Sequence, residues 1–114
     1  MPVIGQGSVI LVELMDPQGR NPKVRPAIVV TEDRTIQAGG PINVVAVTSS
    51  VTLPLSETHV ELPWNASGSA GSGLKKRSVA VCDWLLPIER TQIERVIGHL
   101  PSPITFQILS RLPL

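Results

Sequence analysis

Short aliphatic runs separated by polar, proline- and glycine-containing turns recur along the chain. Their lengths and their content of β-branched residues predict β-strands. The predicted strands are Gly7–Leu14, Ala27–Val30, Ile42–Thr48, His59–Leu62, Ser78–Leu86 and Val96–Leu100. Ala27–Val30 is wholly apolar, as expected of a strand covered on both faces, whereas His59–Leu62 alternates and suits a half-exposed strand. Several short strands with interrupting turns predict a small, strongly curved barrel in a mainly β fold.

The end of the sequence follows a different period and predicts a helix. Ser102 is a favourable N-cap residue, and Pro103 would then occupy the first helical position. Apolar residues recur at four-residue spacing with two others beside them: Ile104, Ile108 and Leu112, with Phe106 and Leu109. This spacing places an apolar stripe along one side of the helix, so we expect the helix to pack on the barrel.

The segments between these runs are expected to be turns and loops. Met15–Lys23 contains two prolines and a glycine, and Glu32–Gly40 is polar and leads into another turn. Asn65–Gly73 consists of residues too small and polar to pack, which predicts a flexible loop inside the domain. Pro87 is expected to end the strand before it, and Arg90–Glu94 suits a single helical turn.

Length and composition limit the classes of protein that the chain can represent. Its 114 residues suffice for one domain with a single core. Hydrophobic residues make up 42% of the chain, but they include two Trp, one Phe and no Tyr. This scarcity argues against proteins that stack successive bases of a single strand on aromatic side chains. The formal net charge is +1, so any nucleic-acid site must be a local cluster of cations rather than a basic face.

The sequence also carries indications of the compartment. The single cysteine, Cys82, has no partner for an intrachain disulfide, which indicates a reducing environment. The first residues lack a basic segment followed by an apolar one, so no signal peptide is expected. No apolar run approaches the roughly 18 residues needed to span a bilayer. We therefore expect a cytoplasmic protein without a membrane partner.

The stretch Val24–Val30 joins a buried strand to a charge at the entrance of that strand. Pro26 has no N–H to donate, so it is expected at the first residue of the strand. It also restricts Arg25 to extended conformations, which holds the guanidinium on stiff backbone. This placement suits an arginine that binds phosphate or takes part in catalysis. The simpler alternative is a solvated charge at a strand end.

Further cations gather near this arginine and after the glycine- and serine-rich loop. Arg20 and Lys23 precede Arg25 within six positions, and Lys75–Arg77 contains two lysines and an arginine. The second group is either a solvated part of the loop or a group that grips nucleic-acid phosphates as the loop closes over them.

Five segments, taken in order, together match a known family. They are Gly7–Leu14, Arg25–Val30, Asn43–Ser49, Leu74 with Ser78–Asp83, and Val96–Leu100 before the terminal helix. In this order and spacing they resemble the MazF/PemK (Kid) group of toxins from type II toxin–antitoxin systems. The resemblance covers nearly the whole chain and implies one toxin domain over residues 1–114. It further implies an SH3-like barrel of the CcdB/Kid/MazF type with a C-terminal helix, acting as a homodimeric endoribonuclease.

The resemblance implies roles for individual residues. The family's strand-opening arginine falls on Arg25 and its strand-end threonine on Thr48. The family cleaves single-stranded RNA without a metal ion or cofactor, using the 2′-hydroxyl as nucleophile, and leaves a cyclic phosphate and a 5′-hydroxyl. Arg25 and Thr48 would donate hydrogen bonds to the pentavalent transition state as it gains negative charge. The residues expected to hold the RNA are Arg20, Lys23, Ser49, Lys75, Lys76 and Arg77.

Two positions depart from the family's pattern. In one branch an arginine that serves as proton donor precedes the Cys-Asp pair, whereas this chain has Val81 there. The role would then pass to Arg25 or to solvent. The family often has glutamine after the aspartate, whereas this chain has Trp84, which we expect in the core or at a dimer interface. Asp83 is either the base that accepts the 2′-hydroxyl proton or a structural partner of Arg25.

Partners follow from the resemblance as well. We expect a homodimer whose groove is lined by the Asp16–Lys23 loop and the Asn65–Arg77 segment. We also expect a cognate antitoxin with an acidic, amphipathic tail that orders on binding. Two other function classes stay open. One is a protein-binding poison on the same barrel, like the relatives that trap DNA gyrase with a C-terminal tryptophan segment, and the other is a catalytically silent interaction module.

Other candidate chemistry has weaker support in the sequence. His59 and His99 lie 40 residues apart, and the resemblance gives them no role. Cys82 has no histidine nearby in sequence, so we expect a buried, unreactive thiol. No spacing of Cys and His residues fits a zinc site, and none is expected.

Overall fold

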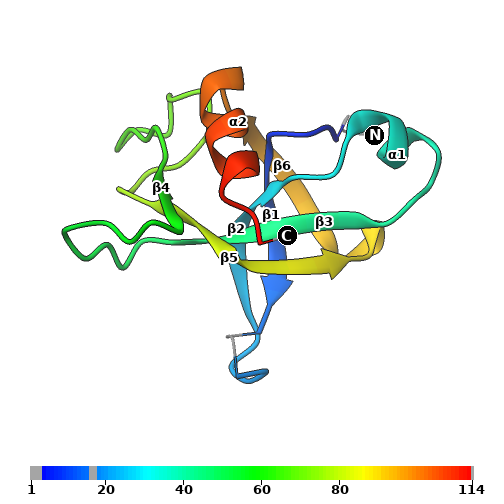
Figure 1. Cartoon of the computed structure of the whole chain (residues 1–114), viewed down its shortest axis with the longest axis horizontal. Coiled ribbons are helices and arrows are strands. Elements are labelled where there is room, and N and C mark those ends of the chain that lie inside the picture. Colours follow the sequence, from blue (N-terminus) through cyan, green and yellow to red (C-terminus); the bar gives the residue numbers. More distant parts are fainter. Residues whose placement is uncertain (1–3, 16–17, 114) are drawn as a thin grey trace.

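A six-stranded antiparallel sheet forms the body of the protein in the computed structural model, which describes residues 4–15 and 18–113. The strand order is β4-β5-β3-β2-β1-β6. The strands are β1 (Ser8–Leu14), β2 (Lys23–Val29), β3 (Ile42–Thr48), β4 (His59–Glu61), β5 (Val79–Ile88) and β6 (Ile93–His99). The helical elements of the described residues are α1 (Asp33–Gln37), the 3-10 turn η1 (Arg90–Gln92) and α2 (Ser102–Ser110). Figure 1 shows the curved sheet with α2 lying across one side of it.

The expected mainly β fold with one C-terminal helix is confirmed, but two strands run through prolines that were expected to bound them. β2 begins at Lys23 and contains Pro26, and β5 continues through Pro87 to Ile88. The pairing of β2 with β3 starts at Ala27, and that of β5 with β4 covers residues 79–81. Each proline therefore lies where one side of its strand has no paired neighbour, which is where a sheet tolerates proline.

Successive residues of the central strands point into two separate apolar cores. Ile28 belongs to the first core, which α2 covers through Ile108, whereas Ala27 belongs to the second core, which α1 covers through Ile36. Because both faces of β2 are covered, the whole run Ala27–Val30 is buried, as its unbroken apolar character predicts.

The helices differ from the prediction in detail. The carbonyl of Pro101 accepts hydrogen bonds from the N–H groups of Ile104 and Thr105, so α2 begins at Ser102 and Pro101 is its N-cap. Proline is tolerated at residue 103 because N–H groups of the first turn have no partner within a helix. Phe106 is 65% exposed and lies outside the packed stripe. The short helix α1 replaces part of the predicted turn, and no helix in the described residues is long and apolar enough to cross a membrane.

The glycine- and serine-rich segment 65–73 is a mostly exposed loop, as predicted, but its last residues pack against β6, contrary to the prediction that the segment is too small and polar to pack. Ser72 is fully buried and its hydroxyl donates to the Pro63 carbonyl at 2.6 Å. The N–H of His99 in β6 donates to the Gly71 carbonyl at 2.9 Å. Small residues allow two backbones to approach in this way, and Gly98 has no side chain to keep them apart. The segment after β4 thereby reaches the other edge strand, β6.

Gly98→Ala tests this closure. The added methyl group would lie against the backbone of Gly71 and Ser72, so we expect a loss of about 1–3 kcal/mol in the free energy of unfolding. Gly71→Ala is the matched control, since its methyl group would make an ordinary contact of 3.7 Å with the His99 carbonyl. Chemical denaturation measures both variants. Equal free energies of unfolding in the two variants would show that the packing of the segment on β6 does not require glycine at residue 98.

Candidate functional site

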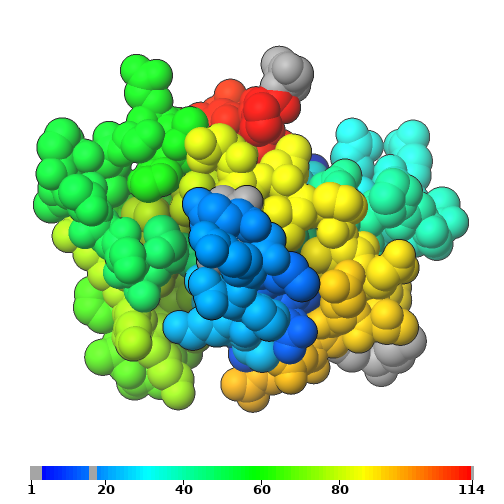
Figure 2. All heavy atoms as spheres, turned by 90° about the horizontal axis from the view of Figure 1, so that it is seen from below, coloured from blue at the N-terminus to red at the C-terminus, as the bar shows by residue number. Residues whose placement is uncertain are grey.

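A groove of about 470 Å³ lies beside the ends of β2 and β3 and is lined by residues from five of the chain's segments. In Figure 2 the blue β1–β2 segment stands beside the green and yellow-green segments that follow β3 and β4. The polar and charged residues that line the groove are Lys23, Arg25, Thr48, Ser49, Ser50, Lys75, Lys76, Ser78 and Arg95. The groove thus gathers most of the residues that the sequence marked for phosphate chemistry.

The groove concentrates positive charge. Five of its lining residues are Lys or Arg, and none of those described is Asp or Glu. The whole chain carries a formal net charge of +1, so the cations of this groove are balanced by carboxylates elsewhere on the molecule. A concave surface of one sign attracts ligands of opposite charge, and this groove therefore suits an anion.

The pairing of β2 with β3 brings Arg25 and Thr48 to the same groove. Ala27 of β2 pairs with Ala46 of β3. Arg25 lies two residues before Ala27, and Thr48 lies two residues after Ala46. Alternation along antiparallel strands therefore directs both side chains to one face of the sheet. Thr48 Oγ1 accepts the N–H of Ser50 at 3.1 Å, so its own O–H is left to donate to a ligand.

The guanidinium of Arg25 rests on an aromatic ring. Its Cζ atom lies 5.7 Å from the centroid of the Trp84 ring. Its Nε atom is buried and has no hydrogen-bond partner among the described residues. Within residues 4–15 and 18–113 no ion pair joins Arg25 to Asp83, the structural partner that the sequence left open.

Three of the predicted site residues do not line the groove. Asp83 is exposed and lines a separate hollow of about 460 Å³, which Trp84 shares. Arg20 is exposed on the β1–β2 segment. Arg77 donates from Nε to Glu61 Oε1 at 2.8 Å.

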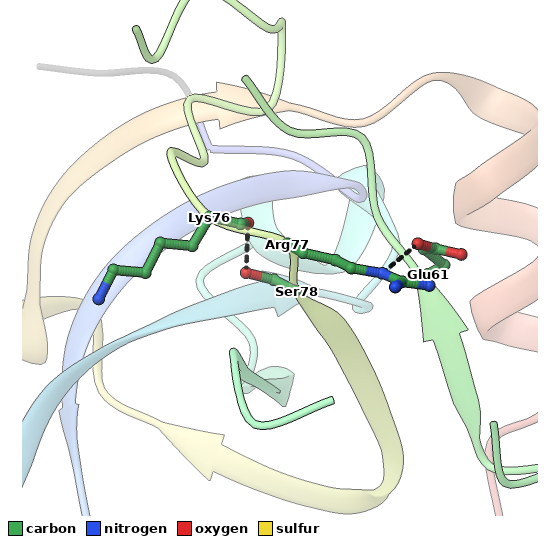
Figure 3. Close-up of polar contacts among 4 residues, drawn as sticks. All are labelled: Glu61, Lys76, Arg77 and Ser78. Carbon is green, nitrogen blue, oxygen red and sulfur yellow. Dashed lines mark hydrogen bonds and ion pairs between the residues drawn. The ribbon is translucent and has the colours of Figure 1, made fainter. Parts of the chain in front are cut away.

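The cationic run Lys75–Arg77 is divided between two sides of the chain. Figure 3 shows the side chains of Lys76 and Arg77 pointing in opposite directions. The Ser78 hydroxyl donates to the Lys76 carbonyl at 2.9 Å and so braces the backbone between them. Lys75 and Lys76 line the groove, whereas Arg77 faces Glu61.

Arg95 is a groove residue that the sequence did not mark. It lies on β6 opposite Leu11 of β1, and both line the groove. The predicted last strand began at Val96, so Arg95 was assigned to no element. No motif identifies it, because only the pairing of β6 with β1 brings it to this face.

The remaining nucleophilic and imidazole groups lie outside the groove. Cys82 is fully buried, and burial raises the pKa of its thiol because the thiolate would lose its solvation, although the positive charge of Arg111 acts in the opposite direction. His59 and His99 are not among the groove's lining residues. Among the described residues, no group of three or more His, Cys, Asp or Glu side chains comes together to hold a metal ion.

The arrangement defines a class of small, curved antiparallel proteins with a cationic groove at the strand ends and a C-terminal helix. A model of one family matches residues 5–114: the PemK-like, MazF-like toxins of type II toxin–antitoxin systems. The chain belongs to this toxin family. A comparison with curated proteins found no match.

Solved structures share the fold over nearly the whole chain. The toxin MazF-mt6 of Mycobacterium tuberculosis has a TM-score of 0.71 at 22% identity, covering 92% of this chain and 91% of that one. A MazE–MazF structure from Deinococcus radiodurans gives 0.71 at 18% identity, with 97% and 94% covered. An endoribonuclease in complex with its cognate antitoxin, from mycobacterial species, gives 0.71 at 13% identity, with 96% and 90% covered. These similarities establish the MazF-type fold.

Proposed function

We propose that this toxin-family protein is an endoribonuclease that cleaves single-stranded RNA in a sequence-selective manner and without a metal ion. The observation that carries the proposal is that Arg25 and Thr48 line one groove with four further cations and no described carboxylate. A guanidinium and a hydroxyl supply hydrogen bonds to phosphate oxygens, and the surrounding cations suit a polyanionic chain. The description of the mycobacterial relative as an endoribonuclease supports the same activity here.

The proposed reaction is an internal displacement at phosphorus. The 2′-oxygen attacks the adjacent phosphorus, the bond from phosphorus to the 5′-oxygen breaks, and the products are a 2′,3′-cyclic phosphate and a 5′-hydroxyl. The nonbridging oxygens gain charge in the transition state, where Arg25 donates two hydrogen bonds and Thr48 donates one. Removing one such preorganised donor typically costs about 3 kcal/mol, or roughly a hundredfold in rate.

Two protons must move in this reaction, one from the 2′-hydroxyl and one to the departing 5′-oxygen. Val81 has no proton to give, so Arg25 or solvent protonates the departing oxygen in our proposal. Asp83 is the candidate base. Because it is exposed and lines the neighbouring hollow, it would accept the proton through a bridging water molecule.

Cleavage of a defined RNA in EDTA, with the ends of the products mapped, tests this function. We expect cyclic phosphate and 5′-hydroxyl ends. Arg25→Lys keeps the charge but loses the two-pronged geometry, so kcat should fall about a hundredfold with little change in RNA affinity. Thr48→Val should lower kcat by a smaller factor. Arg34→Lys, on exposed α1, is the matched control and should cleave at the wild-type rate.

Several results would contradict this assignment. Cleavage by Arg25→Lys at the wild-type rate would remove Arg25 from the reaction, and activity that EDTA abolishes would remove the claim of metal independence. Asp83→Asn should slow cleavage strongly at an unchanged melting temperature. A wild-type rate in that variant would assign the 2′-hydroxyl proton to water.

The position of each arginine predicts a difference in RNA binding between Arg95 and Arg77. Arg95→Gln removes a groove cation, so it should weaken the binding of an uncleavable 2′-O-methyl RNA and lower the slope of log affinity against log salt by about one. Arg77→Gln should leave both quantities unchanged, because its guanidinium faces Glu61. Fluorescence anisotropy at several salt concentrations measures them. The reverse pattern would place the RNA on the Glu61 side of the chain.

We also propose a homodimer and a cognate antitoxin whose acidic tail occupies the cationic groove. The antitoxin complexes among the structural relatives support such a partner. Lys23 and Lys75 lie on the two segments expected to line the dimer's groove, and both line the cationic groove of the single chain. The antitoxin and a 2′-O-methyl RNA should compete in a binding assay, and simultaneous binding at full affinity would contradict a shared groove.

Sedimentation of the protein at micromolar concentration should show a dimer, and monomers alone would contradict the proposed homodimer.

A further inference from the structure

The partly buried side chain of Arg25 lies over an aromatic ring, whereas a buried arginine ordinarily pairs with a carboxylate. Its side chain is half-buried, and its Nε atom lacks a hydrogen-bond partner among the described residues. A guanidinium with buried atoms is usually paired with a carboxylate. Here the contact is the face of Trp84, 5.7 Å from Cζ to the ring centroid.

An irregularity in β5 places Trp84 at this position. Val45 of β3 pairs with Leu85, but the next residue, Ala46, pairs with Val81. The three residues between them, 82–84, therefore have no partner in β3. Such a bulge redirects side chains, and the indole of Trp84 packs against the second core, to which Ala27 and Ala46 belong. Its ring is thus fixed by apolar contacts on the face that Arg25 shares.

An aromatic face and a carboxylate have opposite consequences for an arginine that must bind phosphate. A carboxylate would accept the N–H groups and neutralise the charge, and a phosphate would have to displace it. A ring attracts the cation through its electron-rich face and occupies none of the N–H donors in the guanidinium plane. The groove that receives this guanidinium contains no described Asp or Glu.

We propose that Trp84 is the positioning residue for Arg25, orienting the guanidinium while leaving its donors for the scissile phosphate. The inference rests on the proposed endoribonuclease function and adds to it a residue at a position where the family often has glutamine. The ring of Trp84 lies under the Arg25 guanidinium but does not line the groove, since Trp84 lines the separate hollow beside Asp83. It acts on the reaction only through Arg25.

Two substitutions separate the aromatic face from simple bulk. Trp84→Phe keeps a smaller face, whereas Trp84→Leu keeps an apolar side chain without one. We expect Trp84→Leu to lower kcat about tenfold with KM nearly unchanged, and Trp84→Phe to retain most of the wild-type kcat. Trp64→Leu is the matched control, because this other tryptophan is 44% exposed and should leave kcat unchanged. Melting temperatures accompany all three variants.

Fluorescence gives a readout that does not depend on cleavage. In a Trp64→Phe background the emission comes from Trp84 alone, since the chain has two Trp residues. Adding an uncleavable 2′-O-methyl RNA should change this emission, because a phosphate that binds the guanidinium changes the electric field at the ring beneath it. The change should be lost in Arg25→Gln.

The outcomes distinguish this inference from the proposed function. Equal kcat in Trp84→Leu and Trp84→Phe would overturn the inference. A loss of kcat that appears only in variants with a lowered melting temperature would overturn it too. An emission that is unaffected by RNA and by Arg25→Gln would overturn it as well. If the wild-type protein binds RNA but cleaves none, the proposed function fails. The Trp84 emission still decides whether the Arg25 guanidinium above the ring binds an RNA phosphate.

Discussion

The close approach of the 65–73 segment to β6 is the contact on which the groove depends. The Gly71 carbonyl accepts the His99 N–H, and the absence of a side chain at Gly98 lets the two backbones meet. The chain then continues directly into Leu74–Lys76, which form one wall of the groove. Glycine and serine here are therefore not signs of a linker. They are the residues whose small size allows a loop to pack against an edge strand and bring lysines to a defined place.

The opposite wall depends on where strand pairing stops. Both cores bury β2 from Ala27 onward, whereas Arg25 and Pro26 extend past the start of its pairing with β3. The backbone there is stiff, but it has no paired strand on its β3 side. A charged side chain can therefore lie at the edge of an apolar core. A phosphate ligand suits this arrangement because the other lining residues add cations and no described carboxylate opposes them.

The electrostatic design differs from what the overall charge suggests. A chain with a formal net charge of +1 has no basic face, yet five cations line one groove. Arg77 illustrates the separation, because it points away from Lys76 and pairs with Glu61 (Figure 3). Arg25 is handled differently, with an indole in place of a carboxylate. The two arginines illustrate the difference between a cation that is neutralised and one that is kept available.

The sequence by itself determined the strand pattern, the terminal helix, the family, and Arg25 with Thr48 as candidate site residues. These features are local or carried by motifs: apolar runs such as Ile42–Thr48 specify strands wherever they pack. The tertiary structure decided what depends on pairing between distant segments. Arg95 reaches the groove only through the register of β6 on β1, and Trp84 meets Arg25 only because residues 82–84 leave the β3 register. Arg95 has no signal in sequence, and Trp84 appears there only as a departure from the family's glutamine, because partners across a sheet are set by register and not by chain neighbours.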